Sequence, residues 1–150
     1  MNHSKILELL PYASPFRFVD ELERVDEQGA KGYYTFPPNA GFYRGHFPGH
    51  PVTPGVILSE TMAQIGLVCL GIYLLQDKIA SGQQPGVAFS SQAVDYLKPV
   101  YPGERVKVVS EKVYFRFGKL KCKVQLFNAQ SELACQGELA GMCSPITAQL

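Results

Sequence analysis

The stretch that decides the fold is PGVILSETMAQIGLVCLGIYLLQ, from Pro54 to Gln76. Between Val56 and Leu75 its single charged residue is Glu60. Thr53 and Pro54 form a helix-start signal, because a threonine hydroxyl caps free N–H groups and proline suits the first helical position. We therefore predict a helix that begins at Pro54 and ends near Gln76, about 34 Å long at about 1.5 Å per residue.

This stretch is long enough to cross a membrane, but we expect it to be buried by protein instead. An ionisable residue such as Glu60 is costly inside a bilayer, and no lysine or arginine lies in the stretch. Ala63, Gly66 and Gly71 fall on one helical face, together with leucines, so that another element can pack closely there.

Runs of aromatic and β-branched residues on both sides of the helix predict strands. One hydrophobic helix surrounded by strands favours a single α+β domain, residues 1–150, whose antiparallel sheet wraps the helix. The predicted elements are a short helix at 3–10, a hairpin of strands at 16–20 and 31–36, a long loop at 37–53, and strands at 86–97, 104–117, 120–129 and 132–143.

The composition of the chain excludes some classes of function. The net charge of +1 argues against a basic nucleic-acid-binding protein, and 46% hydrophobic residues are typical of a globular chain. The four cysteines have no paired metal or redox spacing, so we expect free thiols in a reducing cytoplasm. The N-terminal apolar stretch is too short and too charged for a signal peptide, which also favours a cytoplasmic location.

Common catalytic and cofactor motifs are missing from the sequence. There is no G-x-S-x-G elbow, phosphate loop or G-x-G-x-x-G fingerprint. His46 and His50 have the spacing of helical metal ligands, but the prolines and glycines among them prevent a helix, and no third ligand accompanies them. We therefore expect neither a metal nor another cofactor.

His46 and Glu60 are the two residues best suited to acid–base chemistry. His46 sits in a proline- and glycine-rich turn, and histidine is a usable base near neutral pH. Glu60 sits in an apolar helix, where burial raises a carboxyl pKa and makes it a usable acid. The alternatives are a histidine that holds its turn by hydrogen bonds and a carboxylate paired with Gln64 or an arginine.

Gly55 adds a third group, because we expect it at the second helical position with a free N–H at the positive end of the helix. One reaction requires a base, an acid and an oxyanion-binding N–H together: removal of a proton next to a carbonyl with loss of a β-hydroxyl.

Residues 45–64, GHFPGHPVTPGVILSETMAQ, closely resemble the signature of the hot-dog-fold β-hydroxyacyl-[acyl carrier protein] dehydratases of bacterial fatty acid synthesis. The resemblance implies the hot-dog fold, with His46 as catalytic base, Glu60 as catalytic acid and Gly55 as oxyanion donor. It also implies a homodimer in which each site combines residues of both subunits, and further assembly of three dimers into a hexamer. A third implication is a non-proline cis peptide bond after His46. Glu rather than Asp at position 60 resembles the branch that only dehydrates.

We further expect Phe47, Met62, Gln64 and Phe89 to contact the acyl substrate, with packing in the core as the alternative. Tyr12 stands where the family commonly has histidine, and Ser59 and Thr61 stand where apolar or small residues are usual. Two other functions remain open on the same fold, an acyl thioesterase and a non-catalytic acyl-binding protein.

Charge is segregated along the chain, with an acidic excess in residues 1–30 and a basic excess in residues 104–123. Lys119, Lys121 and Lys123 alternate along one predicted strand and so share a face. We expect this face to dock an acidic acyl carrier protein; an ordinary solvated strand face is the alternative.

Overall fold

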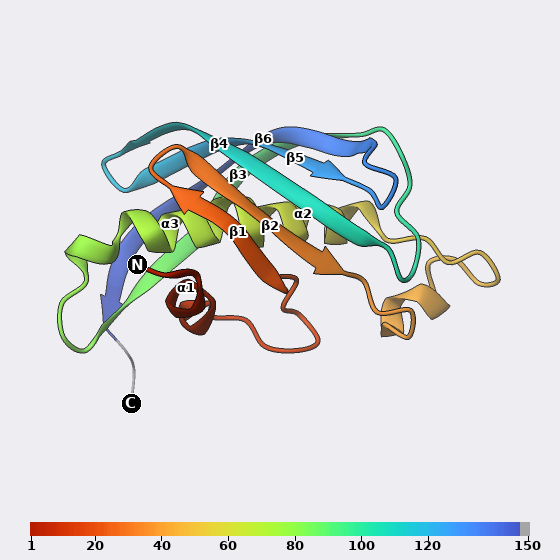
Figure 1. The fold of residues 1–150 in the computed structure, drawn as a ribbon, viewed down its shortest axis with the longest axis horizontal. Coiled ribbons are helices and arrows are strands. Elements are labelled where there is room, and N and C mark those ends of the chain that lie inside the picture. Colours follow the sequence, from red (N-terminus) through yellow and green to blue (C-terminus); the bar gives the residue numbers. More distant parts are fainter. Residues whose placement is uncertain (148–150) are drawn as a thin grey trace.

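The fold is one antiparallel sheet wrapped around one long helix, as the sequence predicts (Figure 1). A computed structural model describes residues 1–147. The six strands lie in the order β1-β2-β4-β5-β6-β3. Their bounds are β1 Glu21–Asp26, β2 Gly29–Thr35, β3 Gln83–Tyr96, β4 Arg105–Arg116, β5 Lys119–Phe127 and β6 Leu133–Thr147, and a short helix α1, His3–Leu9, precedes them.

The central helix has three consecutive segments, α2 (Gly55–Met62), the π-helical η2 (Ala63–Val68) and α3 (Cys69–Leu74). Its most apolar window has a mean hydropathy of 1.7 and is 78% buried inside the domain. The stretch that resembles a membrane span is therefore the core of the fold. The helix ends at Leu74, slightly before the predicted end, and a single 3-10 turn, η3 (Gln76–Lys78), follows. The π-helical segment was not predicted.

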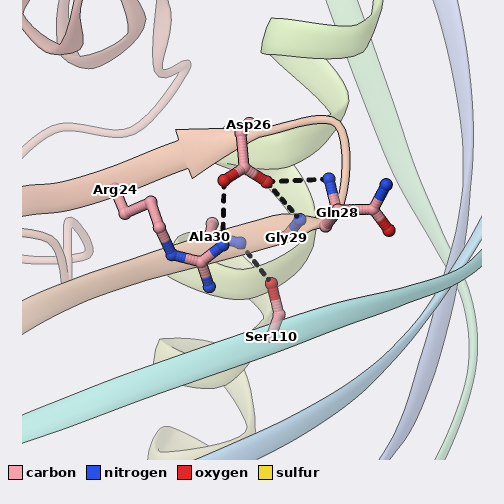
Figure 2. Close-up of polar contacts among 6 residues, drawn as sticks. All are labelled: Arg24, Asp26, Gln28, Gly29, Ala30 and Ser110. Atoms are coloured by element: carbon pink, nitrogen blue, oxygen red, sulfur yellow. Dashed lines mark hydrogen bonds and ion pairs between the residues drawn. The ribbon is translucent and has the colours of Figure 1, made fainter.

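The small residues of the helix let the sheet approach closely, as predicted. A Cβ atom on Gly66 would lie 3.0 Å from the side chains of both Ser110 and Val124, and one on Gly71 would lie 3.0 Å from Cys143 Sγ. Ser110 is itself buried, and its hydroxyl donates to the Gly66 carbonyl oxygen (2.8 Å). The same hydroxyl accepts the Ala30 N–H (3.1 Å), so one side chain joins β4, the helix and β2 (Figure 2).

Asp26 organises the turn between β1 and β2 (Figure 2). Its carboxylate accepts the N–H groups of Gln28 (2.8 Å) and Gly29 (3.2 Å) and a hydrogen bond from Arg24 (2.9 Å). These bonds hold the pKa of Asp26 below its usual range, and the bond from Gln28 has the largest effect. The carboxylate therefore stabilises the turn at neutral pH, and this contribution is lost as pH falls through the lowered pKa.

The prediction for the first strand of the hairpin was wrong. Residues 16–20 are not a strand, and β1 begins only at Glu21. The Phe18 N–H donates to Gln64 Oε1 on the central helix (2.7 Å), and the side chains of Phe18 and Val19 are buried in the core. This segment therefore packs across the helix, and the charged run after it pairs with β2.

The four later strands are confirmed with shifted ends. β3 begins three residues before the predicted 86, and β6 continues to Thr147 instead of ending at 143. β3 lies at the edge of the sheet and pairs only with β6 within the described chain. Its residues are exposed over most of its length, so a long strand edge faces outward.

The four cysteines are free, as predicted, and all four are buried. Burial raises the pKa of Cys69, Cys122 and Cys135 to about 12 and that of Cys143 to about 11. At neutral pH they are protonated, apolar core residues rather than nucleophiles.

Ser110→Ala tests the link between helix and sheet. The substitution leaves the Gly66 carbonyl and the Ala30 N–H without their buried partner, so we expect a loss of about 1–3 kcal/mol in the free energy of unfolding. Urea denaturation measures it, with exposed Ser81→Ala as the matched control. Equal stability of the two variants would contradict this account.

Candidate active site

His46 is held in one orientation by Val52. Its Nδ1 lies 2.9 Å from the Val52 carbonyl oxygen, and the Val52 N–H donates back to the His46 carbonyl (2.9 Å). Because a carbonyl oxygen can only accept, Nδ1 carries the proton of the neutral ring. Nε2 is then unprotonated and available as a base, so the turn-holding role and the catalytic role are compatible in one residue.

The turn around His46 is closed by its own backbone. The N–H groups of Phe47 and His50 each donate to the carbonyl of the other, at 3.1 and 2.9 Å. The peptide bond between His46 and Phe47 is cis, as the family resemblance implies, and the two rings stack with centroids 4.1 Å apart. Phe47 is 54% exposed and lines a neighbouring pocket with His50, rather than the pocket of His46.

The start of the central helix differs from the prediction by one residue. Pro54 is the cap and Gly55 the first helical residue, whereas the sequence predicted Thr53 as cap and Gly55 as the second position. The Thr53 hydroxyl does not cap the helix because it is hydrogen-bonded to the Tyr43 hydroxyl (2.6 Å), in a buried pair. The Thr53 N–H donates to the Val100 carbonyl (2.8 Å), which fixes the helix start against the segment between β3 and β4.

Gly55 still presents a free N–H. Within residues 1–147 this group has no acceptor, as expected for the first turn of a helix. Gly55 and His46 line the same open pocket, of about 410 Å³, together with Leu58 and Tyr96. A base and an anion-binding N–H therefore share one cavity.

Glu60 is half-buried on another side of the helix and does not line the His46 pocket. Burial raises the pKa of its carboxyl, and a hydrogen bond from Gln64 Nε2 to Oε2 (2.9 Å) offsets this in part. The pairing with Gln64 that the sequence left open is present. It does not prevent an acid role, because the pKa of the carboxyl is still raised above its usual value.

Gln64 is fully buried and makes three hydrogen bonds. Besides bonding Glu60, its Nε2 donates to the Phe16 carbonyl (3.0 Å) and its Oε1 accepts the Phe18 N–H (2.7 Å). The amide is therefore fixed in orientation, and it fixes the carboxyl in turn.

The remaining predicted contacts lie apart from the His46 pocket. Met62 is fully buried, with its sulfur 3.5 Å from Cys135 Sγ, and Phe89 is 43% exposed on the edge strand β3. Gln64 lines none of the pockets described, so its position is that of a residue that orients Glu60. Substrate contact by these three residues stays a prediction.

Two tyrosines add to the site. Tyr12 is partly buried near Glu60, and burial together with this carboxylate raises the pKa of its phenol to about 12. Tyr96, at the end of β3, lines the His46 pocket and was not predicted. The sequence indicates Tyr12, because it stands where the family commonly has histidine. Nothing in the sequence around Tyr96 indicates its proximity to Gly55.

No group of three or more histidine, cysteine, aspartate or glutamate side chains is arranged for a metal ion in the described part of the chain. The groups considered for the candidate chemistry are His46, Glu60 and the Gly55 N–H.

Comparison with known proteins defines the class. Residues 10–140 match the family described as a FabA-like domain, and the chain belongs to this family. A curated relative is the 3-hydroxyacyl-[acyl-carrier-protein] dehydratase FabZ of Caldicellulosiruptor bescii. It is 36% identical over 141 residues, which cover 92% of this chain and 95% of the relative.

Solved structures show the same hot-dog fold at low sequence identity. The dehydratase heterocomplex ApeI:P from Xenorhabdus doucetiae has a TM-score of 0.74 at 11% identity, covering 93% of this chain and 90% of that one. The thioesterase HI1161 from Haemophilus influenzae has a TM-score of 0.68 at 14% identity, covering 96% and 91%. These likenesses show the fold, which dehydratases and thioesterases share.

Gln64→Leu tests how the acidity of Glu60 is set. The amide hydrogen bond favours the carboxylate, so its removal should raise the pKa of Glu60 further. Carboxyl ¹³C NMR titration of both proteins measures the shift, and circular dichroism verifies the fold. An unchanged or lowered pKa in the folded variant would show that Gln64 does not control this carboxyl.

Proposed function

We propose that this protein dehydrates (3R)-hydroxyacyl thioesters carried on acyl carrier protein to trans-2-enoyl thioesters. The observation that carries the proposal is the pocket lined by both His46, whose Nδ1 is bonded to a carbonyl and leaves Nε2 as the base, and Gly55, whose N–H has no acceptor in the described chain. Membership of the FabA-like family and the similarity to FabZ dehydratases support it, and they favour dehydration over thioester hydrolysis.

Each group takes one part of the reaction. His46 Nε2 removes the proton from C2, and the negative charge that develops on the carbonyl oxygen is held by the Gly55 N–H and the positive end of the helix. The C2–C3 double bond forms as the C3–O bond breaks. Glu60 delivers its proton to the departing hydroxyl, which leaves as water.

The active form we propose is a homodimer, because a single chain does not bring base and acid together. Glu60 is five residues after Gly55, about 140° around a helix, and it does not line the His46 pocket. The exposed edge of β3, which carries Phe89, is a ready surface for strand pairing with a second copy. His46 of one subunit and Glu60 of the other then complete a site, and such dimers assemble further into a trimer of dimers in the cytoplasm.

The carrier protein is proposed to dock on β5. Lys119, Lys121 and Lys123 alternate with buried residues and so point to one face of the sheet. Lys121 is 3.1 Å from Glu138, which reduces its free charge. Beside this face the β4–β5 turn exposes Phe117 almost completely, at 98%, so cationic and apolar surface adjoin each other. An acidic protein that delivers an acyl chain suits such a surface.

His46→Ala and Glu60→Gln test the reaction. Each variant lacks one proton-transfer group, so we expect the rate of enoyl thioester formation from a 3-hydroxyacyl thioester to fall about 10²–10⁴-fold. Ultraviolet absorbance of the conjugated product follows the reaction, with His3→Ala and Glu111→Gln as matched controls away from the site. Near-normal rates in both site variants would overturn the assignment. Release of free thiol as the main reaction would indicate a thioesterase, and binding without turnover an acyl-binding protein.

Charge reversal at Lys119, Lys121 and Lys123 tests docking. The triple glutamate variant should raise KM for carrier-linked substrate and leave KM for a small thioester analogue unchanged, because only the former uses the basic face. Kinetics with both substrates at low and high salt measure the effect. An equal rise for both substrates would instead indicate damage to the active site.

A further inference from the structure

Tyr96 covers one side of the helix start. It is the last residue of β3, and its ring lies directly against Gly55: a Cβ atom built on Gly55 would be 3.1 Å from Cε1 and 3.2 Å from Cζ of the tyrosine. The ring is 49% exposed and lines the pocket that holds His46. The Tyr96 ring therefore fills the space beside Gly55 on the side of β3 and also lines the pocket; we call this ring the aromatic wall.

Ser59 holds this wall in place. It lies one helical turn after Gly55, is 3% exposed, and its hydroxyl is hydrogen-bonded to the Tyr96 hydroxyl. A buried hydroxyl needs a partner, and the tyrosine supplies it. The ring is thus fixed at its base by the strand and at its tip by the helix, which restricts its rotation away from the pocket. Ser59 is also one of the positions where this chain departs from the family pattern.

The proposed reaction places the substrate against this wall. With the carbonyl oxygen at the Gly55 N–H and one C2 proton at His46, the remaining substituent on C2 has to lie in the same pocket. Leu58 and Tyr96 line that pocket beside Gly55. We expect a hydrogen to fit this position, whereas a methyl group there would press against these side chains.

We propose that Tyr96, fixed by Ser59, is a specificity-determining residue that selects 3-hydroxyacyl thioesters unbranched at C2 and rejects those with a C2 alkyl group. This selectivity rests on the proposed dehydratase function, whose substrate placement it uses. One methyl group in an apolar pocket typically changes kcat/KM about 10–200-fold, which is the range of discrimination expected.

The experiment compares kcat/KM for the small-thioester forms of 3-hydroxybutyrate and 2-methyl-3-hydroxybutyrate, both with C2 protons for His46 to remove. The wild type should prefer the unbranched substrate. Tyr96→Ala should reduce this preference at least tenfold, and Ser59→Ala should reduce it less, because the ring stays but is no longer fixed. Ser59→Thr keeps a hydroxyl and should restore the preference. Tyr114→Ala is the control for loss of a tyrosine elsewhere on the sheet.

Two results would overturn the proposal. The first is an unchanged preference in folded Tyr96→Ala; if kcat/KM then falls equally for both substrates, the tyrosine is merely structural. The second is failure of the wild type to dehydrate the unbranched substrate. That result would refute the proposed function itself, and the selectivity with it, whereas the first leaves the dehydratase reaction standing.

Discussion

Burial of the 20-residue apolar helix Gly55–Leu74 is the constraint on which the rest of this structure depends. A helix apolar on all sides has to be enclosed, and a sheet encloses it only if it can curve closely around it. Gly66 and Gly71 permit this approach, because a side chain at either position would press against residues of the sheet.

The same enclosure creates the candidate site. Wrapping the helix leaves its N-terminus at the rim of the sheet, where the Gly55 N–H has no acceptor in the described chain. The Thr53 N–H is bonded to the Val100 carbonyl in the segment between β3 and β4, and Val52 orients His46 within its loop. The imidazole is thus placed beside the helix end without belonging to the helix. Glu60 obtains its raised pKa from the burial that the helix imposes on it. Folding and acid–base chemistry thus have a common origin.

The sequence predicts those parts of the molecule that depend on strong local patterns. The apolar helix, the later strands and the antiparallel sheet follow from hydrophobicity and turn residues, and residues 45–64 indicate His46, Gly55 and Glu60 together. Errors occur where tertiary contacts outweigh local preference. Residues 16–20 have the composition of a strand but pack on the helix, where Gln64 accepts a backbone hydrogen bond from them. Thr53 does not cap the helix because its hydroxyl is hydrogen-bonded to Tyr43. The contact of Tyr96 with Gly55 joins residues far apart in the chain, which no local pattern specifies.

Gln64 connects Glu60 to a segment of the chain outside the His46 pocket. Its amide is hydrogen-bonded at the same time to Glu60 and to the backbone of Phe16 and Phe18, in the segment that precedes β1. A shift of that segment moves the amide, and with it the hydrogen bond that offsets the raised pKa of the carboxyl. The proton affinity of the Glu60 carboxyl is thus open to adjustment by changes near the N-terminus, far along the chain from the motif that contains His46 and Gly55.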